Sequence, residues 1–215
     1  MNAFALILLL LSGFYSCKSQ SVLSAGSDES VSQILSRLNS RDTIDVLDFS
    51  HKNLKMLPDL SAYKVKKLNI SYNDLDTLPM KNLPHYLVVL DASHNKIGKG
   101  LNFINVKWET KKIKNNVSRH LREVDLSYNK LVGVTFYLSN AGAEIDRIIL
   151  SNNNLERLEL DFIKKISYLD ISDNTKLSNE VAFDLELIQN IRHDNIANDK
   201  PLEFIKKKRV YIPDK

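Results

Sequence analysis

Apolar and polar residues alternate in short segments that recur along the middle of the chain. Each segment has two apolar residues two places apart, a Ser directly after them and a further apolar residue at its end, and the segments begin at residues 47, 68, 90, 124, 148 and 169. Residues two apart in a strand point to the same side. Each segment therefore predicts a short strand that buries an apolar pair such as Leu68 and Ile70.

The segments are evenly spaced, with intervals of 21 to 24 residues and one longer interval of 34. A unit of this size cannot bury its apolar face alone, so a repeat of this period predicts a solenoid whose stacked coils share one core. Five segments also carry an asparagine at the same place: Asn73, Asn95, Asn129, Asn153 and Asn174. Lys52 occupies that place in the first segment.

The template resembles the core L-x-L-x-x-N-x-L of the leucine-rich repeat family, and the resemblance covers residues 47 to about 177. It implies an α/β fold, a solenoid with a curved parallel sheet and about six repeats. It also implies that the asparagine amides bond backbone groups of neighbouring turns. A buried bend without such partners would cost about 1 to 3 kcal/mol for each unpaired group.

The terminal coils of a solenoid need caps, because they would otherwise expose apolar core residues to water. Val31, Ile34, Leu35 and Leu38 recur at helical spacing after Ser30, which predicts a short amphipathic helix as the N-terminal cap. The expected organisation is a signal segment at 1–17, a Ser-rich tether at 18–30, a helical cap at 31–46, repeats at 47–180 with an insertion at 99–119, and an irregular C-terminal cap with a basic tail at 181–215.

An apolar run without charges, Ala3 to Leu11, precedes the chain's one cysteine, Cys17. The run is typical of an export signal and is shorter than the about 20 apolar residues that span a membrane. The sequence "FYSC" resembles the lipobox of bacterial lipoproteins, and the Ser-rich stretch after it resembles envelope lipoproteins of Bacteroidetes-type bacteria. This resemblance implies acylation of Cys17 and a membrane-anchored, exported protein. The alternative is that Cys17 is removed with the signal and the protein is secreted.

The composition and charge of the chain limit the classes of partner that it is expected to bind. With 43% hydrophobic and 26% charged residues and a formal charge of +4, the chain is an ordinary globular protein with a mild basic excess. The lysines lie in separate clusters instead of one stripe with aromatic platforms, so nucleic acid is not expected as a partner.

The outward positions of the predicted sheet are the main candidate binding face, because they form a polar ladder with an acidic stripe. Its residues are Asp48, His51, Asn69, Tyr72, Asp91, His94, Asp125, Tyr128 and Asp170. A Ser follows each acidic position by two places, and such a Ser is expected to bond its own bend. Carboxylates beside alternating His and Tyr suit a basic peptide, a protein surface or a sugar.

The insertion at 99–119 is the second candidate. It holds the single tryptophan, Trp108, beside Lys111 and Lys112. One interpretation is a coil whose Phe103, Ile104, Val106 and Trp108 pack onto the solenoid. The other is a protruding loop that contacts a partner, since loops carry function and Trp is favoured at binding hot spots.

Catalytic motifs are not found in the sequence: it has no H-E-x-x-H, C-x-x-C, G-x-S-x-G or Walker-type segment. The expectation is a non-enzymatic binding module without cofactor or metal, whose ligand is another protein or a glycan. One alternative is a structural spacer of the cell envelope without a high-affinity ligand. Another is a secreted eukaryotic innate-immune or adhesion protein, which glycans on the sequons at Asn69 and Asn116 would favour.

Overall fold

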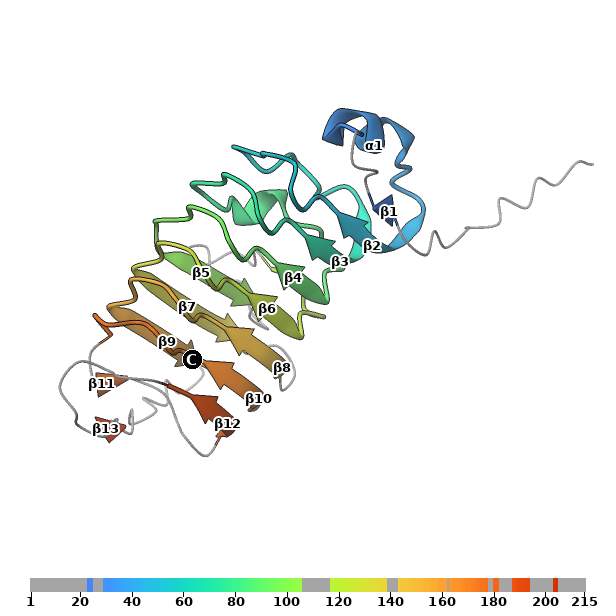
Figure 1. The fold of residues 1–215 in the computed structure, drawn as a ribbon. Coiled ribbons are helices and arrows are strands. Elements are labelled where there is room, and N and C mark those ends of the chain that lie inside the picture. Colours follow the sequence, from blue (N-terminus) through green and yellow to red (C-terminus); the bar gives the residue numbers. More distant parts are fainter. Residues whose placement is uncertain are drawn as a thin grey trace, which may run out of the picture.

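The structure is a computed structural model of the chain, and it describes residues 23–24, 29–105, 117–138, 143–161, 163–177, 180–181, 187–193 and 203–204. The chain winds into a solenoid of stacked coils (Figure 1), which confirms the predicted fold class. The predicted signal segment and most of the predicted tether and C-terminal cap lie outside the described residues.

Eight parallel strands form the larger sheet, called here the front sheet. In spatial order they are β1 (Leu23–Ser24), β2 (Thr43–Asp48), β3 (Lys64–Asn69), β4 (Val89–Asp91), β6 (Glu123–Asp125), β8 (Glu144–Ile149), β10 (Lys165–Asp170) and β12 (Ile188–Arg192). β1 comes from within the predicted tether, where it pairs with β2 at the edge of the sheet.

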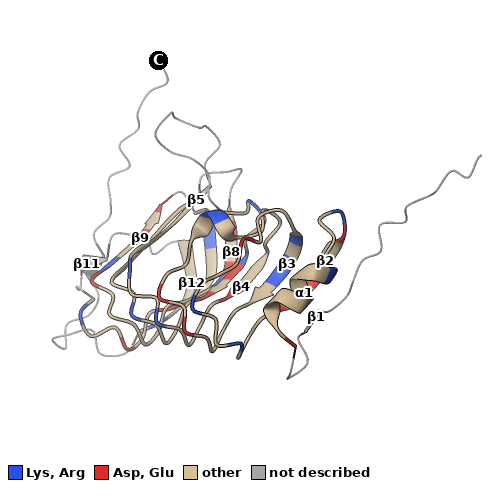
Figure 2. Cartoon of the chain, turned by 90° about the horizontal axis from the view of Figure 1, so that it is seen from above, with Lys and Arg blue, Asp and Glu red and all other residues tan. Residues whose placement is uncertain are grey.

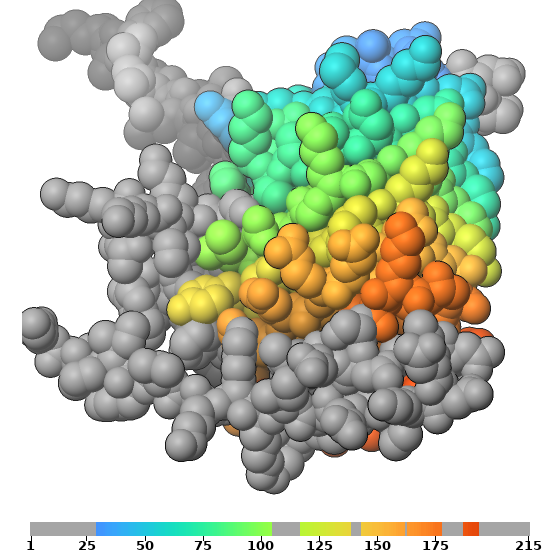
Figure 3. All heavy atoms as spheres, turned by 90° about the vertical axis from the view of Figure 1, so that its left-hand side faces the viewer, coloured from blue at the N-terminus to red at the C-terminus, as the bar shows by residue number. Residues whose placement is uncertain are grey.

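The register of the front sheet aligns the repeats with one another. The first residue of each repeat pairs with the first residue of the next: Leu47, Leu68, Leu90, Val124, Ile148 and Leu169. All six are at most 1% exposed. The alignment stacks like on like, so one apolar core runs the length of the solenoid. In Figure 3 the coils lie as successive bands in sequence order.

A second parallel sheet, called here the back sheet, consists of β5 (Leu101–Asn105), β7 (Gly133–Leu138) and β9 (Arg157–Asp161). Its strands alternate buried and less buried residues, so one face joins the core. Phe103 and Phe136 are both fully buried and stack with ring centroids 4.6 Å apart. The first part of the predicted insertion is therefore a core strand, because Leu101 and Phe103 alternate like any other strand.

The remaining elements are short. β11 (Glu180–Val181) pairs with β13 (Glu203–Phe204), and a 3-10 turn, η1, covers Met80–Asn82.

The N-terminal helix is confirmed as α1 (Val31–Arg37). Ser30 caps it: the Ser30 hydroxyl accepts the Gln33 backbone N–H, and the Gln33 side chain accepts the Ser30 backbone N–H at 2.8 Å. Ile34, 1% exposed, joins the core next to the first coil. The helix therefore covers apolar surface that the first coil would otherwise expose.

Candidate functional site

The turn that follows each front strand has an unusual backbone. Six residues occupy the same place in successive repeats, and all have a φ between 52° and 56°: His51, Tyr72, His94, Tyr128, Asn152 and Asp173. Residues other than Gly are uncommon in this left-handed region, and Asn, Asp and His are the types enriched there. The turn is held by the next coil, since His51, Tyr72 and His94 donate their N–H groups to the carbonyls of Ser71, Ser93 and Ser127.

This backbone places four aromatic rings in a column, called here the ring column: His51, Tyr72, His94 and Tyr128. Neighbouring ring centroids are 4.5, 4.1 and 4.2 Å apart and the planes differ by only 9° to 11°. Tyr72 and Tyr128 remain 49% and 50% exposed. Four predicted face residues from four coils thus form one continuous aromatic surface.

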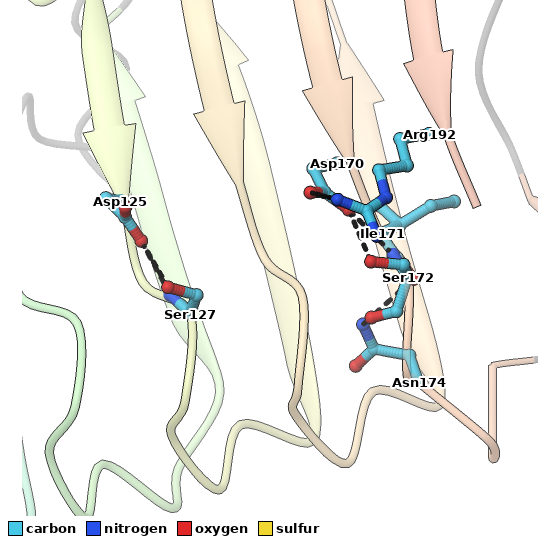
Figure 4. Close-up of polar contacts among 7 residues, drawn as sticks. All are labelled: Asp125, Ser127, Asp170, Ile171, Ser172, Asn174 and Arg192. Atoms are coloured by element: carbon cyan, nitrogen blue, oxygen red, sulfur yellow. Dashed lines mark hydrogen bonds and ion pairs between the residues drawn. The ribbon is translucent and has the colours of Figure 1, made fainter. Parts of the chain in front are cut away.

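A second column, the acid column, lies between the buried apolar pairs of the strands and contains Asp48, Asn69, Asp91, Asp125 and Asp170. In each, Oδ1 accepts the backbone N–H of the Ser two residues later at 2.9 to 3.0 Å. From Asn69 onward the Ser hydroxyl also donates to it at 2.7 Å, as Figure 4 shows for Asp125 and Asp170.

These bonds agree with the expectation that a Ser at this place bonds its own bend. Ser71, Ser93, Ser127, Ser151 and Ser172 are 2% to 7% exposed. A buried hydroxyl needs a partner, and for Ser71, Ser93, Ser127 and Ser172 the neighbouring side chain of the acid column supplies it. The serines therefore support the turn, as the sequence also indicated, and the outer surface consists of the acid column and the ring column.

The electrostatics single out Asp125. Partial burial raises the pKa of its carboxyl, and the negative charge of Asp91 on the next strand raises it further. The bonds from Ser127 and the positive charge of Arg147 act in the opposite direction without cancelling the effect of burial. Asp91 and Asp125 are register partners on β4 and β6, so the two carboxyls occupy adjacent strands.

The C-terminal end of the acid column is different. Asp170 is only 6% exposed, and its Oδ2 lies 4.0 Å from the guanidinium of Arg192. Figure 4 draws this ion pair. Arg147 lies over the ring of Tyr168, 5.0 Å from its centroid. Ile149 occupies the equivalent strand position between Asp125 and Asp170 and interrupts the acid column there. Basic and apolar groups thus limit the acidic surface at this end.

The asparagines perform the role that the resemblance implied. Asn95 donates through Nδ2 to the carbonyl of Ile70 in the preceding coil and of Ala92 and Ser93 in its own, while its Oδ1 accepts the N–H of Leu75. Asn73, Asn129, Asn153 and Asn174 repeat the pattern. All five are at most 8% exposed, so they hold the scaffold and are not part of the face.

Several predicted site residues lie outside the described residues: Cys17, Trp108, Lys111 and Lys112. The structure therefore leaves lipid attachment and the insertion contact as predictions.

Two features were missed by the sequence reasoning. Tyr86, 52% exposed, stacks on His120 at 5.9 Å. A recess of about 260 Å³ lies on the back sheet, lined by Gly100, Asn102, Gly133, Val134, Thr135, Arg157 and Glu159. The strand alternation in residues 133–138 was a signal for that sheet, but it lies outside the repeat template.

Within the described part of the chain, no three His, Cys, Asp or Glu residues gather closely enough to hold a metal ion. The same residues include no helix of the length and apolarity that crossing a bilayer requires. Among the residues coloured in Figure 2, Lys, Arg, Asp and Glu are interspersed along the coils and do not collect in one basic stripe.

Comparison with known proteins gives one result. A family model described as Leucine Rich repeat matches residues 117–134. No curated protein and no solved structure matches the chain. The matched segment contains β6, Tyr128 and Asn129, which belong to the same repeat. The match, the repeated template and the solenoid of registered strands together support a leucine-rich repeat protein.

Proposed function

We propose that the protein is a non-enzymatic binding module whose front face holds another protein. Leucine-rich repeat solenoids are protein-interaction scaffolds, which agrees with this function. The observation that carries it is the exposed ring column beside the acid column. An exposed surface that combines Tyr side chains with fixed polar groups resembles the composition of protein interfaces.

The groups on this face are arranged to present a surface. The Oδ1 atom of each acid-column side chain is occupied by its own Ser, and the stacked rings hold one another. A general base would have to be positioned against a nucleophile or a substrate proton, whereas these carboxylates are positioned against the turn. This arrangement favours binding without turnover.

We propose further that the protein is exported and anchored by acylated Cys17, and that the insertion with Trp108 and Lys111 supplies a second contact. The apolar run before Cys17 and the Ser-rich stretch after it support export and tethering. Expression of the full chain in a bacterium with labelled palmitate tests the anchor. The label should be incorporated into the wild type and be absent from Cys17→Ser; an unlabelled wild type would mean that the protein is secreted.

The binding function is tested by photo-crosslinking in the cells from which the chain comes. A benzoylphenylalanine placed at Tyr72 reports on the front face, and the same residue at Glu156, which is exposed before β9, is the matched control. Discrete protein adducts at Tyr72 and not at Glu156 are expected. Equal adducts at both positions, or none, would instead support a spacer without a high-affinity ligand.

A further inference from the structure

Two neighbouring coils each contribute an aspartate to the acid column and a ring to the ring column. Asp91 and His94 belong to one coil, and Asp125 and Tyr128 belong to the next. Asp91 and Asp125 are register partners, and the rings of His94 and Tyr128 stack at 4.2 Å. A ligand that contacts this pair of coils therefore meets two carboxyls and two ring edges together.

The stacking of the rings determines whether a ligand can contact their faces or only their edges. Sugars are held by aromatic side chains through open ring faces, and stacked rings whose centroids lie 4.1 to 4.5 Å apart leave no room between them. The ring column instead presents its edges, with phenol oxygens and imidazole nitrogens as hydrogen-bonding groups. The structure thus favours a protein over a glycan as the ligand of this surface.

The carboxyl pair is the most acidic part of the face. Within the described residues, no ion pair joins Asp91, Asp125 or the neighbouring Glu123, although Asp170 in the same column has Arg192 beside it. Two like charges on adjacent strands repel each other, and strands lie about 4.8 Å apart. A cation placed over both would relieve that repulsion.

We propose that these coils are the docking site for an arginine-bearing segment of the partner protein, with a guanidinium over Asp91 and Asp125 and adjacent apolar side chains against the ring column. This proposal rests on the proposed function and names the chemistry of its partner. A guanidinium is planar, has five N–H donors and is weakly hydrated, so it can bond two neighbouring carboxylates at once. A lysine ammonium provides a point charge and is expected to bind this pair less well.

The test uses the full chain and a displayed library of random peptides. Selected peptides should be enriched in arginine next to apolar residues, and Arg→Lys in a selected peptide should weaken binding about tenfold or more. The double variant D91N/D125N should weaken binding of the same peptide by at least as much. Asn69 already makes these bonds to Ser71 in the acid column, so asparagine is expected to preserve the turns.

A matched control removes the same charge elsewhere. The control variant D76N/E156Q changes two exposed carboxylates away from the acid column. The backbone of Asp76 bonds Gly98, just before β5, and the backbone of Glu156 bonds Val132, just before β7. It should bind the peptide like the wild type, and circular dichroism should show all variants folded.

The outcomes separate this proposal from the proposed function. Selected peptides that lack arginine, and that bind D91N/D125N as well as the wild type but lose affinity for Tyr72→Ala, would overturn the arginine site and leave a binding face. Peptides insensitive to every front-face variant, together with equal crosslinking at Tyr72 and Glu156, would overturn both. Equal weakening by D76N/E156Q would reduce the effect to general charge attraction and also overturn the site.

Discussion

Individual residues on the front face serve both the fold and the surface. Asp125 supports its turn through Ser127 and at the same time presents a partly buried carboxyl whose pKa is raised. Tyr72 accepts a left-handed backbone, with a φ of 53°, and gains stacking on both sides. The same side chain therefore contributes both to the stability of the turn and to the surface that a partner would contact.

Replacement of Asp125 by Asn should leave stability at neutral pH unchanged or higher. Because the folded-state pKa of this carboxyl lies above its unfolded value, the folded state binds the proton more tightly. Its stabilising contribution is complete below the unfolded pKa and is lost as the pH rises through the folded pKa. The ionised carboxylate therefore costs stability at pH 7, and D125N removes that cost while keeping the bonds to Ser127.

Urea unfolding at pH 7 and at acidic pH measures this effect. The advantage of D125N over the wild type should shrink as the carboxyl becomes protonated. Asp125→Ala, which leaves the Ser127 donors unpaired, should instead cost about 1 to 3 kcal/mol. A D125N protein that is less stable than the wild type at pH 7 would contradict the raised pKa of Asp125.

The ring column can be tested by Tyr72→Asn. Asparagine tolerates the left-handed backbone, as Asn152 does at the same place in a later repeat. Only the two stacking contacts are then lost, and the expected cost is about 1 to 3 kcal/mol, taking about 0.5 to 1.5 kcal/mol for each aromatic contact. Chemical denaturation measures it. No loss of stability would show that the rings only lie near each other.

At the scale of elements, the asparagines and the back sheet position the strands. Asn129 connects Ile97 and Ala92 of the preceding coil with Leu126 and Ser127 of its own. Phe103 and Phe136 fill the core beneath the back sheet. The positions of the side chains on the front face therefore depend on these buried contacts.

Asn129→Ala should be severely destabilising. The change leaves several buried backbone groups without partners, each worth about 1 to 3 kcal/mol, so a total of about 3 kcal/mol or more is expected. Lys52→Ala is the control at the corresponding place of the first repeat. Lys52 is bonded there through its backbone N–H to Asn73, so its replacement should cost under about 1 kcal/mol. Equal losses in thermal unfolding would contradict this role of the asparagines.

At the scale of the whole molecule, the described coils form a stack in which each front strand pairs with the strands of the neighbouring coils. Long-range order then comes from the shared core, and the ends are protected by α1 on one side and β12 on the other. The net charge of the chain is +4, yet the middle of its front face carries carboxyls. A basic ligand is thus attracted locally to a protein that is basic as a whole.

Ile34→Ala should loosen the N-terminal end first. Removing a fully buried isoleucine costs about 2 to 5 kcal/mol, and in a stack the loss is felt mainly by the adjacent coils. Hydrogen exchange should become faster in β2 and β3 while β8 and β10 keep most of their protection. Uniform acceleration along the solenoid would show that the coils unfold only together.

Much of the fold could be predicted because the repeat is visible as a regular spacing of residues along the sequence. The apolar pairs, such as Leu68 and Ile70, and the asparagines, such as Asn95, recur at intervals that predict stacked coils. The capped helix after Ser30 was also recognisable, since its signals lie within one turn. The acid and ring columns could be named residue by residue, because each repeat contributes one member at the same place.

The tertiary structure alone decided what these columns present. The left-handed turns close the ring faces, the serines become buried partners of the acid column, and Asp170 meets Arg192 from β12. The back sheet likewise depends on contacts between strands that the repeat template does not include. The sequence determined which residues recur, since period is a local property, whereas exposure, stacking and charge pairing depend on distances between coils that form only on folding.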